Sequence, residues 1–520
     1  MTSSDTSIAP PAPRGQDLAA LMQALAVALV AIREGRSWTL ANAQTPAHLH
    51  AGVQALGFTV LRHLGRAQAL RDALAPKPPP PMVDALLCAA LALLVAKEAP
   101  YPPHTLLDQT VQAAKLQAGA QSQAGFINAC LRRFLRERQA LMQYTDEVPS
   151  ARWNYPDWWL ARLRQDHAQK WQRVAQQGNQ PAPLQLRVNT LQTSQAQLLD
   201  DLTQAGVAAR AFGSSGLELE RHGDVRRLPG YAEGRFSVQD AAAQIAAPLL
   251  LAGLSAGASP LRVLDACAAP GGKAAHLLQY AAEQQLPMAL CAVELDEKRA
   301  ERISENLTRL QLPAAQDTVE VVVQDALQYA KQALAQGVQF DAILLDAPCT
   351  ASGIVRRHPD VPWLRRESDV TQLGRQQGEL LRALWPLLPL GGRMLYCVCS
   401  VFHAEGQGQI AAFLTRNTDA HLLPSPGHLN PGKGAVQTRI QDNEASDASS
   451  SPPSASASWE FIHTVSHDGF YYALLEKRAR VHLDSAAAAA SVLLDDHART
   501  VLRATGPRPK QNPYRRPTRR

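Results

Sequence analysis

The sequence predicts a multidomain protein with an all-helical bundle over residues 16–145, a small α+β unit over 146–235, and an open α/β sheet over 236–478. Its 520 residues exceed one ordinary domain and suggest about three. A composition of 46% hydrophobic and 19% charged residues is typical of a globular chain with several cores. The pattern of apolar residues changes at each boundary, and residues 479–520 follow as an Ala-rich helix and a basic, disordered tail.

Helical periodicity predicts the N-terminal bundle. Asp84–Ala96 and Leu106–Leu116 place Leu, Val and Ala at helical spacings. Gly125–Arg138 adds an amphipathic helix with four arginines, which could contact nucleic acid or form a solvated face. The apolar run Ala24–Ile32 has nine residues, too few to cross a membrane, and we expect an amphipathic helix there. The Pro-rich segment 76–81 predicts a stiff connector.

Cysteine usage and charge limit the classes of protein. Seven cysteines, without a zinc-type CxxC pair, predict a reducing cytoplasm, no disulfide framework and no metal site. The net charge of +6 equals the six Lys and Arg side chains of Gly506–Arg520. We expect this tail either to attract phosphates without sequence choice or to act only as a solubilising end.

Four tryptophans mark the start of the second unit. They predict a small helical unit pinned by aromatic side chains, and the strand-like Leu184–Val188 follows it. The tryptophans are Trp153, Trp158, Trp159 and Trp171.

Short, continuous apolar runs then alternate with helical stretches, as expected for strands buried on both faces of a parallel sheet. The runs are Leu261–Leu264, Ala289–Val293, Val319–Val323, Phe340–Leu345 and Arg393–Val398. The Ser/Pro/Ala-rich stretch Glu444–Ser458 predicts a disordered surface loop, and Gly469–Leu475 predicts a final strand.

Polar groups follow these runs. Asp265, Glu294, Asp325 and Asp346 come at or near the ends of four runs, and Cys399 ends the fifth. Ligands of an open parallel sheet bind beyond the carboxyl ends of its strands, so we expect the five groups to converge on one rim.

A glycine-rich turn, Ala266–Lys273, links the first strand to a helix and would let a ligand approach the backbone closely. It has neither the GxGxxG spacing nor a phosphate-loop GK[ST]. With Glu294 placed for ribose hydroxyls, the turn favours an adenosine-bearing ligand, either a nicotinamide dinucleotide or S-adenosylmethionine.

Two cysteines at neighbouring strand ends decide between these ligands. Cys349 closes Asp346-Ala-Pro-Cys, and Cys399 follows Tyr396-Cys-Val. Carbon 5 of cytosine accepts a methyl group only after a thiolate adds to carbon 6, and a base must then remove the carbon-5 proton. Two cysteines meet that need, with Asp346 acting at ring nitrogen 3. A disulfide between them is geometrically possible but disfavoured in a reducing compartment. We expect the remaining candidates to be buried hydrophobes: Cys88, Cys130, Cys291 and Cys397.

These motifs resemble the bacterial Sun/RsmB-type 16S ribosomal RNA cytosine-5 methyltransferases over residues 16–478. The strongest matches are Cys267–Lys273, Asp346–Cys349, Arg356–Asp360 and Tyr396–Ser400. Phe126–Arg132 is similar to the NusB-like RNA-binding domain of that family. The resemblance implies a NusB-like bundle, a small linking domain and a Rossmann-like methyltransferase domain.

The resemblance also implies the roles of the site residues. Cys399 is the expected nucleophile, and Cys349 is expected to assist product release. S-adenosylmethionine is expected to contact Cys267, Ala268, Ala269, Pro270, Gly271, Gly272, Lys273, Glu294, Asp325 and Asp346. For Lys273 the alternative is an ordinary lysine at a helix start. We expect Arg356, Arg357 and His358 to contact phosphates, with surface salt bridges as the alternative.

The implied partner is 16S ribosomal RNA in an unassembled or partly assembled small subunit. The protein is expected to be a cytoplasmic monomer and to have no membrane partner. Cys397-Val398 stands where Ala-Thr is usual, and Gln324 replaces a common glycine. A non-catalytic RNA-binding protein would explain the bundle but not the paired cysteines. A nucleotide-dependent oxidoreductase would explain the turn but not Asp-Ala-Pro-Cys.

Overall fold

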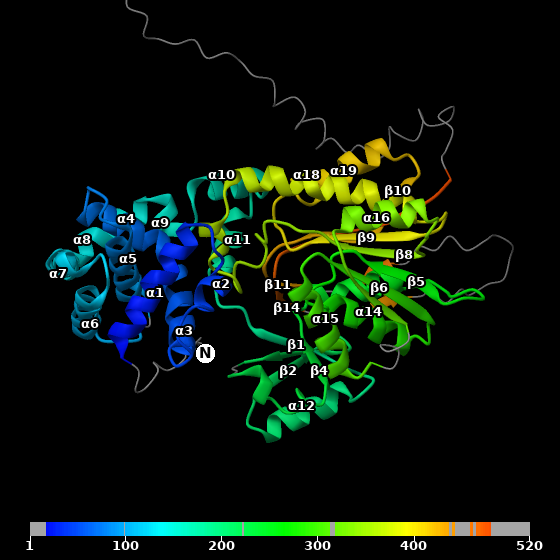
Figure 1. Cartoon of the computed structure of the whole chain (residues 1–520), viewed down its shortest axis with the longest axis horizontal. Helices are drawn as coiled ribbons and strands as arrows, with labels where there is room; N and C mark the ends of the chain where they lie inside the picture. The colour runs from blue at the N-terminus through cyan, green and yellow to red at the C-terminus, as the bar shows by residue number, and fades with distance from the viewer. Residues whose placement is uncertain are drawn as a thin grey trace, which may run out of the picture.

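Three structural units follow one another along the chain (Figure 1). The computed structural model describes residues 17–97, 99–220, 223–312, 318–435, 439–441, 458–460 and 464–479. The predicted loop at 444–458, apart from Ser458, and the predicted tail from residue 480 onward lie outside these residues.

The N-terminal unit is a helical bundle built around α5. Every residue of α5 from Val83 to Leu94 is buried, so the neighbouring helices surround it on all sides. Pro81 begins α5, where a missing N–H costs nothing, and this ends the Pro-rich connector. The bundle contains α1 (Leu18–Arg33), α2 (Trp38–Asn42), α3 (His50–Leu61), α4 (Leu64–Leu74), α5 (Pro81–Val95), α6 (Pro103–Leu116), α7 (Ala124–Arg136) and α8 (Arg138–Glu147).

The predicted helices of this unit are present, with one correction. The sequence pattern gave a single helix over Gly125–Arg138, but α7 ends at Arg136 and α8 begins at Arg138. No helix of the described residues is long and apolar enough to cross a bilayer.

The second unit begins with three helices, α9, α10 and α11, and continues with an antiparallel sheet of order β2-β3-β1-β4 on which a fourth helix, α12, packs. Trp159 of α10 packs edge-on against Phe402 with ring centroids 4.9 Å apart, so the first three helices share a core with the third unit rather than with the small sheet. The elements are α9 (Pro149–Trp153), α10 (Asp157–Asp166), α11 (Trp171–Gly178), β1 (Leu184–Val188), α12 (Gln195–Gln204), β2 (Ala209–Phe212), β3 (Gly216–Leu219) and β4 (Phe236–Val238).

The third unit is a three-layer α/β structure whose sheet has the order β10-β15-β9-β8-β5-β6-β7. Strands β5 to β9 are parallel, and β15 and β10 are added antiparallel. The strands are β5 (Leu261–Asp265), β6 (Met288–Glu294), β7 (Val319–Val323), β8 (Ala342–Asp346), β9 (Arg393–Val398), β10 (Ala420–Leu429) and β15 (Phe470–Lys477).

Helices cover both faces of this sheet. One core lies under α13 (Ala246–Leu251), α14 (Gly272–Glu283) and α15 (Glu297–Leu310). The other lies under α16 (Ala326–Ala335), α18 (Glu367–Leu384) and α19 (Gln407–Arg416). The prediction that all five runs are buried on both faces is wrong for β7, because it is the last strand of the sheet and Val323 is 52% exposed.

Candidate active site

The predicted polar groups lie at the carboxyl ends of the parallel strands. β5 pairs with β6 on one side and with β8 on the other, so the strand order reverses at β5. In open α/β sheets such a reversal leaves a crevice in which ligands bind. Asp346 at the end of β8 lies beside Cys397 of β9 in the parallel register.

Cys349 and Cys399 come together across this edge. Their sulfur atoms are 3.4 Å apart, both thiols are free, and both residues are half-buried. The hydrogen bond with Cys399, together with burial, raises the pKa of Cys349 well above its ordinary value. Cys349 therefore keeps its proton at neutral pH and can donate it in a hydrogen bond to the sulfur of Cys399.

Asp346 forms an ion pair beside the two thiols. Its Oδ2 lies 2.6 Å from the Lys273 Nζ, and its Oδ1 accepts a hydrogen bond from Cys397 Sγ at 3.5 Å. Burial lowers the pKa of Lys273, but the carboxylate of Asp346 and the nearby sulfur atoms raise it by more, so the amine stays charged. Lys273 is thus more than a lysine at a helix start, since its ammonium pairs with Asp346 inside the site.

The glycine-rich turn is braced from two sides. Gly271 has φ +92°, and a Cβ there would lie 3.0 Å from the Ile303 Cα, so a side chain is excluded. The Glu294 carboxylate accepts a hydrogen bond from Ala269 N at 3.3 Å and pairs with Arg299 at 3.1 Å. The turn is therefore held open by its own backbone and by one of the predicted acids.

Asp265 is a site residue that the sequence placed on the rim but not among the ligand contacts. It is 1% exposed, and among the described residues neither carboxylate oxygen has a well-aligned hydrogen-bond partner, although the Cys267 N–H lies near enough to lower its pKa slightly. Burial, reinforced by the charge of Asp346, raises the pKa of Asp265 to about 7. A buried carboxyl without a well-aligned partner beside a glycine-rich turn fits a bound ligand that supplies a donor.

Three further residues that were predicted to contact the cofactor, Asp325, Cys267 and Ala268, are held by hydrogen bonds or by burial within the protein. Asp325 caps α16 by accepting hydrogen bonds from Leu327 N and Gln328 N, each at 3.0 Å. Cys267 is half-buried, and burial raises the pKa of its thiol, so it stays protonated. Ala268 N donates to the Val293 carbonyl at 3.0 Å, which joins the turn to β6.

A buried carboxylate that sequence reasoning missed joins the two cysteine loops. Glu405 is fully buried and accepts hydrogen bonds from Thr350, next to Cys349, and from Ser400, next to Cys399. No spacing rule connects a glutamate six residues after a cysteine to a second cysteine loop, so only the folded structure shows this arrangement.

The predicted phosphate contacts of Arg356 and Arg357 are wrong. Arg356 is 4% exposed and donates to Ser466 Oγ at 3.0 Å. Arg357 pairs with the half-buried Asp240 at 2.9 Å and with the fully buried Asp468 at 2.5 Å. The two arginines fasten the loop after Cys349 inside the protein, whereas His358 is exposed.

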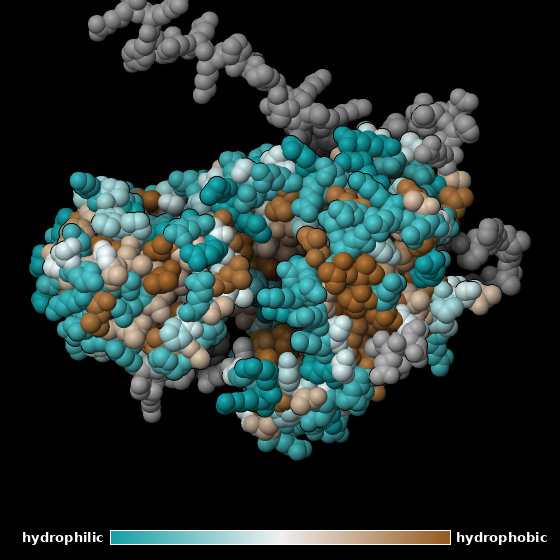
Figure 2. Space-filling model, in the orientation of Figure 1, coloured by the Kyte–Doolittle hydropathy of each residue, from teal (hydrophilic) through white to brown (hydrophobic). Residues whose placement is uncertain are grey.

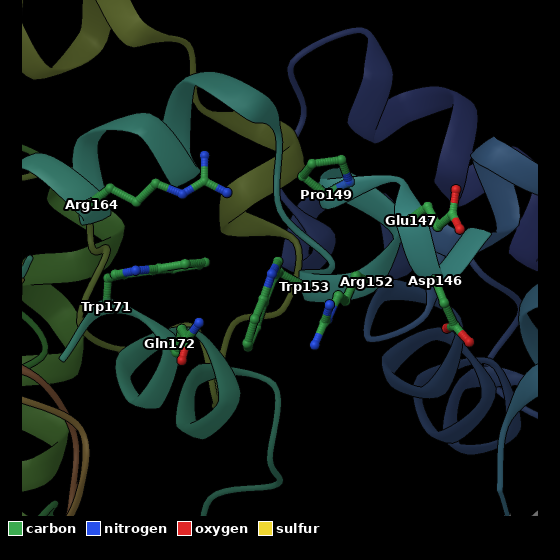
Figure 3. A pocket seen from close by; sticks show the side chains of 8 residues that line it. All are labelled: Asp146, Glu147, Pro149, Arg152, Trp153, Arg164, Trp171 and Gln172. Atoms are coloured by element: carbon green, nitrogen blue, oxygen red, sulfur yellow. The ribbon is translucent and has the colours of Figure 1, made fainter. Parts of the chain in front are cut away.

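A cavity away from this site is lined by side chains of α8, α9, α10 and α11 (Figure 3). Its volume is about 330 Å³, and Trp171 and Trp153 meet in it edge to face, 5.0 Å apart. The Arg164 guanidinium lies 4.6 Å above the Trp171 ring. None of its lining residues is among the predicted site residues, so the candidate site follows from the strand ends and not from this cavity.

Comparison with known proteins gives family matches for all three units. Residues 258–476 match the model of 16S rRNA methyltransferase RsmB/F. Residues 155–226 match the ferredoxin-like domain of the RsmF/B-like methyltransferases, and residues 16–136 match the NusB family.

Curated relatives cover most of the chain. Ribosomal RNA small subunit methyltransferase B of Vibrio cholerae is 37% identical over 439 residues, which is 82% of this chain and 90% of the relative. The enzyme of the same name from Serratia proteamaculans is 39% identical over 337 residues, 64% of this chain and 74% of the relative. The crystal structure of PH0851 superposes with a TM-score of 0.64 at 22% identity, covering 88% of this chain and 99% of that one, which shows a shared fold.

Proposed function

Because the chain belongs to the RsmB/F family of 16S ribosomal RNA methyltransferases, we propose that it methylates carbon 5 of one cytosine in that RNA, with Cys399 as covalent nucleophile. The observation that carries this proposal is the pair of free thiols 3.4 Å apart at the ends of β8 and β9, beside an aspartate–lysine ion pair. An enzyme that adds a methyl group directly to an amine or hydroxyl has no need of two thiols.

The residues of the β5–α14 turn fit S-adenosylmethionine. The unpartnered carboxyl of Asp265 can accept a hydrogen bond, and a Cβ built on Gly272 meets nothing within 4 Å, so there is room beside the backbone. Bound there, the cofactor supplies an electrophilic methyl group on a sulfonium. It would be held by Asp265 together with Cys267, Ala268, Ala269, Pro270, Gly271, Gly272, Lys273, Glu294, Asp325 and Asp346.

Different side chains of the site then act on different atoms of the cytosine ring. The target base is unstacked, because carbon 6 is out of reach inside a helix, and unstacking costs a few kcal/mol. The Cys399 thiolate adds to carbon 6, and negative charge develops at ring nitrogen 3. Asp346 assists at nitrogen 3 by relaying a proton to it from the Lys273 ammonium, whose Nζ lies 2.6 Å from the Asp346 carboxylate.

Cys349 acts in the second half of the reaction. Its thiol stays protonated beside Cys399, so the carbon-5 proton passes to a water molecule held by Cys349 and from there to solvent, while the Cys349 thiol donates a hydrogen bond to the Cys399 sulfur as it leaves. The electrons of the broken C–H bond re-form the double bond between carbons 5 and 6, and Cys399 leaves as a thiolate.

Trapping of the covalent intermediate tests this proposal. We expect Cys349→Ala to accumulate an RNA–protein adduct that survives denaturing electrophoresis, because release is slowed while attack persists. We expect Cys399→Ala to form no adduct, and Cys130→Ala, which removes a buried cysteine of α7, to behave as wild type. An adduct in Cys399→Ala, or its absence from Cys349→Ala, would contradict the assignment of the two cysteines.

A further inference from the structure

The two cysteines stand on loops that are not neighbours in sequence. Cys349 lies on the segment after β8, and Cys399 on the segment after β9. Since neither segment is regular secondary structure at the cysteine, strand pairing alone does not fix the distance between the sulfur atoms. Beyond the sheet the two segments are joined directly, because Gly353 N donates to the Cys399 carbonyl at 2.9 Å and the Ser352 and Ser400 hydroxyls lie 2.8 Å apart. These contacts follow Cys349 by three and four residues, so they leave the part of the segment next to Cys349 to be held by another group.

Glu405 forms a bridge between the residues next to the two cysteines, Thr350 and Ser400, and we call this bridge the joint. Its Oε1 accepts hydrogen bonds from Thr350 N at 2.8 Å and from Gln377 Nε2 at 3.2 Å. Its Oε2 accepts from Thr350 Oγ1 and from Ser400 Oγ, the latter at 2.6 Å. The Glu405 carboxylate therefore accepts four hydrogen bonds. An ionised carboxylate has about four acceptor positions, so all of them are used.

The joint is buried away from water. Glu405, Thr350, Ser400 and Gln377 are all fully buried, and the Tyr396 hydroxyl donates to the Glu405 carbonyl at 2.5 Å. Hydrogen bonds to a charged acceptor are stronger than neutral ones, and they gain further strength where water is excluded.

We propose that Glu405 is a positioning residue that holds Cys349 and Cys399 at working distance by bridging Thr350 to Ser400. This inference rests on the proposed function, in which Cys349 acts on the adduct formed by Cys399. Glu405 touches no reacting atom itself. Without the Glu405 carboxylate, the distance between Cys349 and the Cys399 adduct is no longer fixed. We therefore expect slower release of Cys399 from the methylated base.

Two readouts test the proposal in the full-length protein. Glu405→Ala should lower the rate of methylation roughly 10- to 100-fold, a range typical of a misplaced catalytic group. Its KM for S-adenosylmethionine should change little, because the cofactor turn is on another loop. The variant should also accumulate the covalent RNA adduct, as Cys349→Ala does.

The second readout needs no RNA. Dibromobimane alkylates two neighbouring thiols, and peptide mapping gives the yield of the Cys349–Cys399 cross-link. We expect a high yield in wild type and a low yield in Glu405→Ala. Glu405→Gln keeps an acceptor for Thr350 N and should restore part of both the yield and the rate. Ser400→Ala removes one donor to Glu405 together with the Ser400 contacts to Ser352 and Phe402 N, and it should also lie between the extremes.

Asp419→Asn is the matched control, because it changes another carboxylate of the same unit, the acceptor for Trp385 Nε1. It should match wild type in both readouts. If Glu405→Ala does not fold, Glu405→Gln and Ser400→Ala decide the question. Wild-type cross-linking and turnover in these variants would overturn the proposal, as would loss of cofactor binding in parallel with turnover while cross-linking stays high. Absence of an adduct in Cys349→Ala would instead count against the proposed function, and the cross-linking yield would still test the joint.

Discussion

At the scale of single residues, burial determines which groups of the site carry a proton. Cys267 is held as a thiol, and Asp265 has a pKa of about 7, because each lies where an anion is poorly solvated. Cys349 is held as a thiol by its hydrogen bond with Cys399 and, in addition, by burial. Lys273 stays charged, because the Asp346 carboxylate 2.6 Å away raises its pKa. The crevice thus combines two ion pairs, Lys273–Asp346 and Arg299–Glu294, with two protonated thiols and the buried carboxyl of Asp265.

The raised pKa of Asp265 makes stability depend on pH. Between about pH 4 and 7 the folded protein binds more protons at this carboxyl than the unfolded chain, so stability falls as pH rises through this window. Asn carries no charge, so Asp265→Asn should melt at a higher temperature than wild type at pH 8, and the difference should shrink toward pH 4. Melting curves of the cofactor-free proteins from pH 4 to 8 measure this.

The control for that experiment is Asp108→Asn, a change at an exposed position of α6. It should leave the wild-type pH dependence in place. Parallel wild-type and Asp265→Asn curves across the whole range would show that Asp265 is not the group responsible.

At the scale of elements, the loop between β8 and α17 (Val361–Leu364) is fastened at several points. Arg357 reaches Asp240 and Asp468, 117 and 111 residues away in the sequence. Arg365 donates to the carbonyls of Thr350 and Cys349 at 3.2 and 3.3 Å. These contacts give the Cys349 segment a fixed shape before any RNA is bound.

Removal of Arg357 should therefore reduce stability. Arg357→Ala removes the ion-pair partner of the half-buried Asp240 and leaves the buried Asp468 only Arg356, 3.9 Å away, so it should cost about 3 kcal/mol of unfolding free energy in urea titrations. The salt dependence of RNA binding should not change, because no phosphate contact is lost. Arg226→Ala, which breaks a surface pair with Asp224, should leave the unfolding curve unchanged. A stable Arg357→Ala with a shallower salt dependence would restore the phosphate-contact interpretation.

The sequence predicted elements better than it predicted contacts. The runs around Asp265, Glu294 and Asp346 became β5, β6 and β8 within about two residues, since buried strands are visible as continuous apolar runs. The partners of Arg357 and the role of Glu405 could not be predicted, because both depend on which distant loops the fold brings together.

At the scale of the whole molecule, the helical bundle and the catalytic unit meet at the end of the Cys349 loop. The Trp363 indole donates to the Leu61 carbonyl at 3.2 Å, and Trp38 N donates to the Asp360 carboxylate at 2.9 Å. The surface is hollowed where the three units meet (Figure 2). A strand of RNA held by the bundle would therefore be close to the loop that positions Cys349.

Bisulfite sequencing of 16S ribosomal RNA tests the central claim most directly, because 5-methylcytosine resists the conversion that unmodified cytosine undergoes. RNA from cells with the gene should contain one protected cytosine that is converted in cells without it. The wild-type gene should restore protection, and the Cys399→Ala gene should not. An identical conversion pattern with and without the gene, or protection restored by Cys399→Ala, would contradict the account.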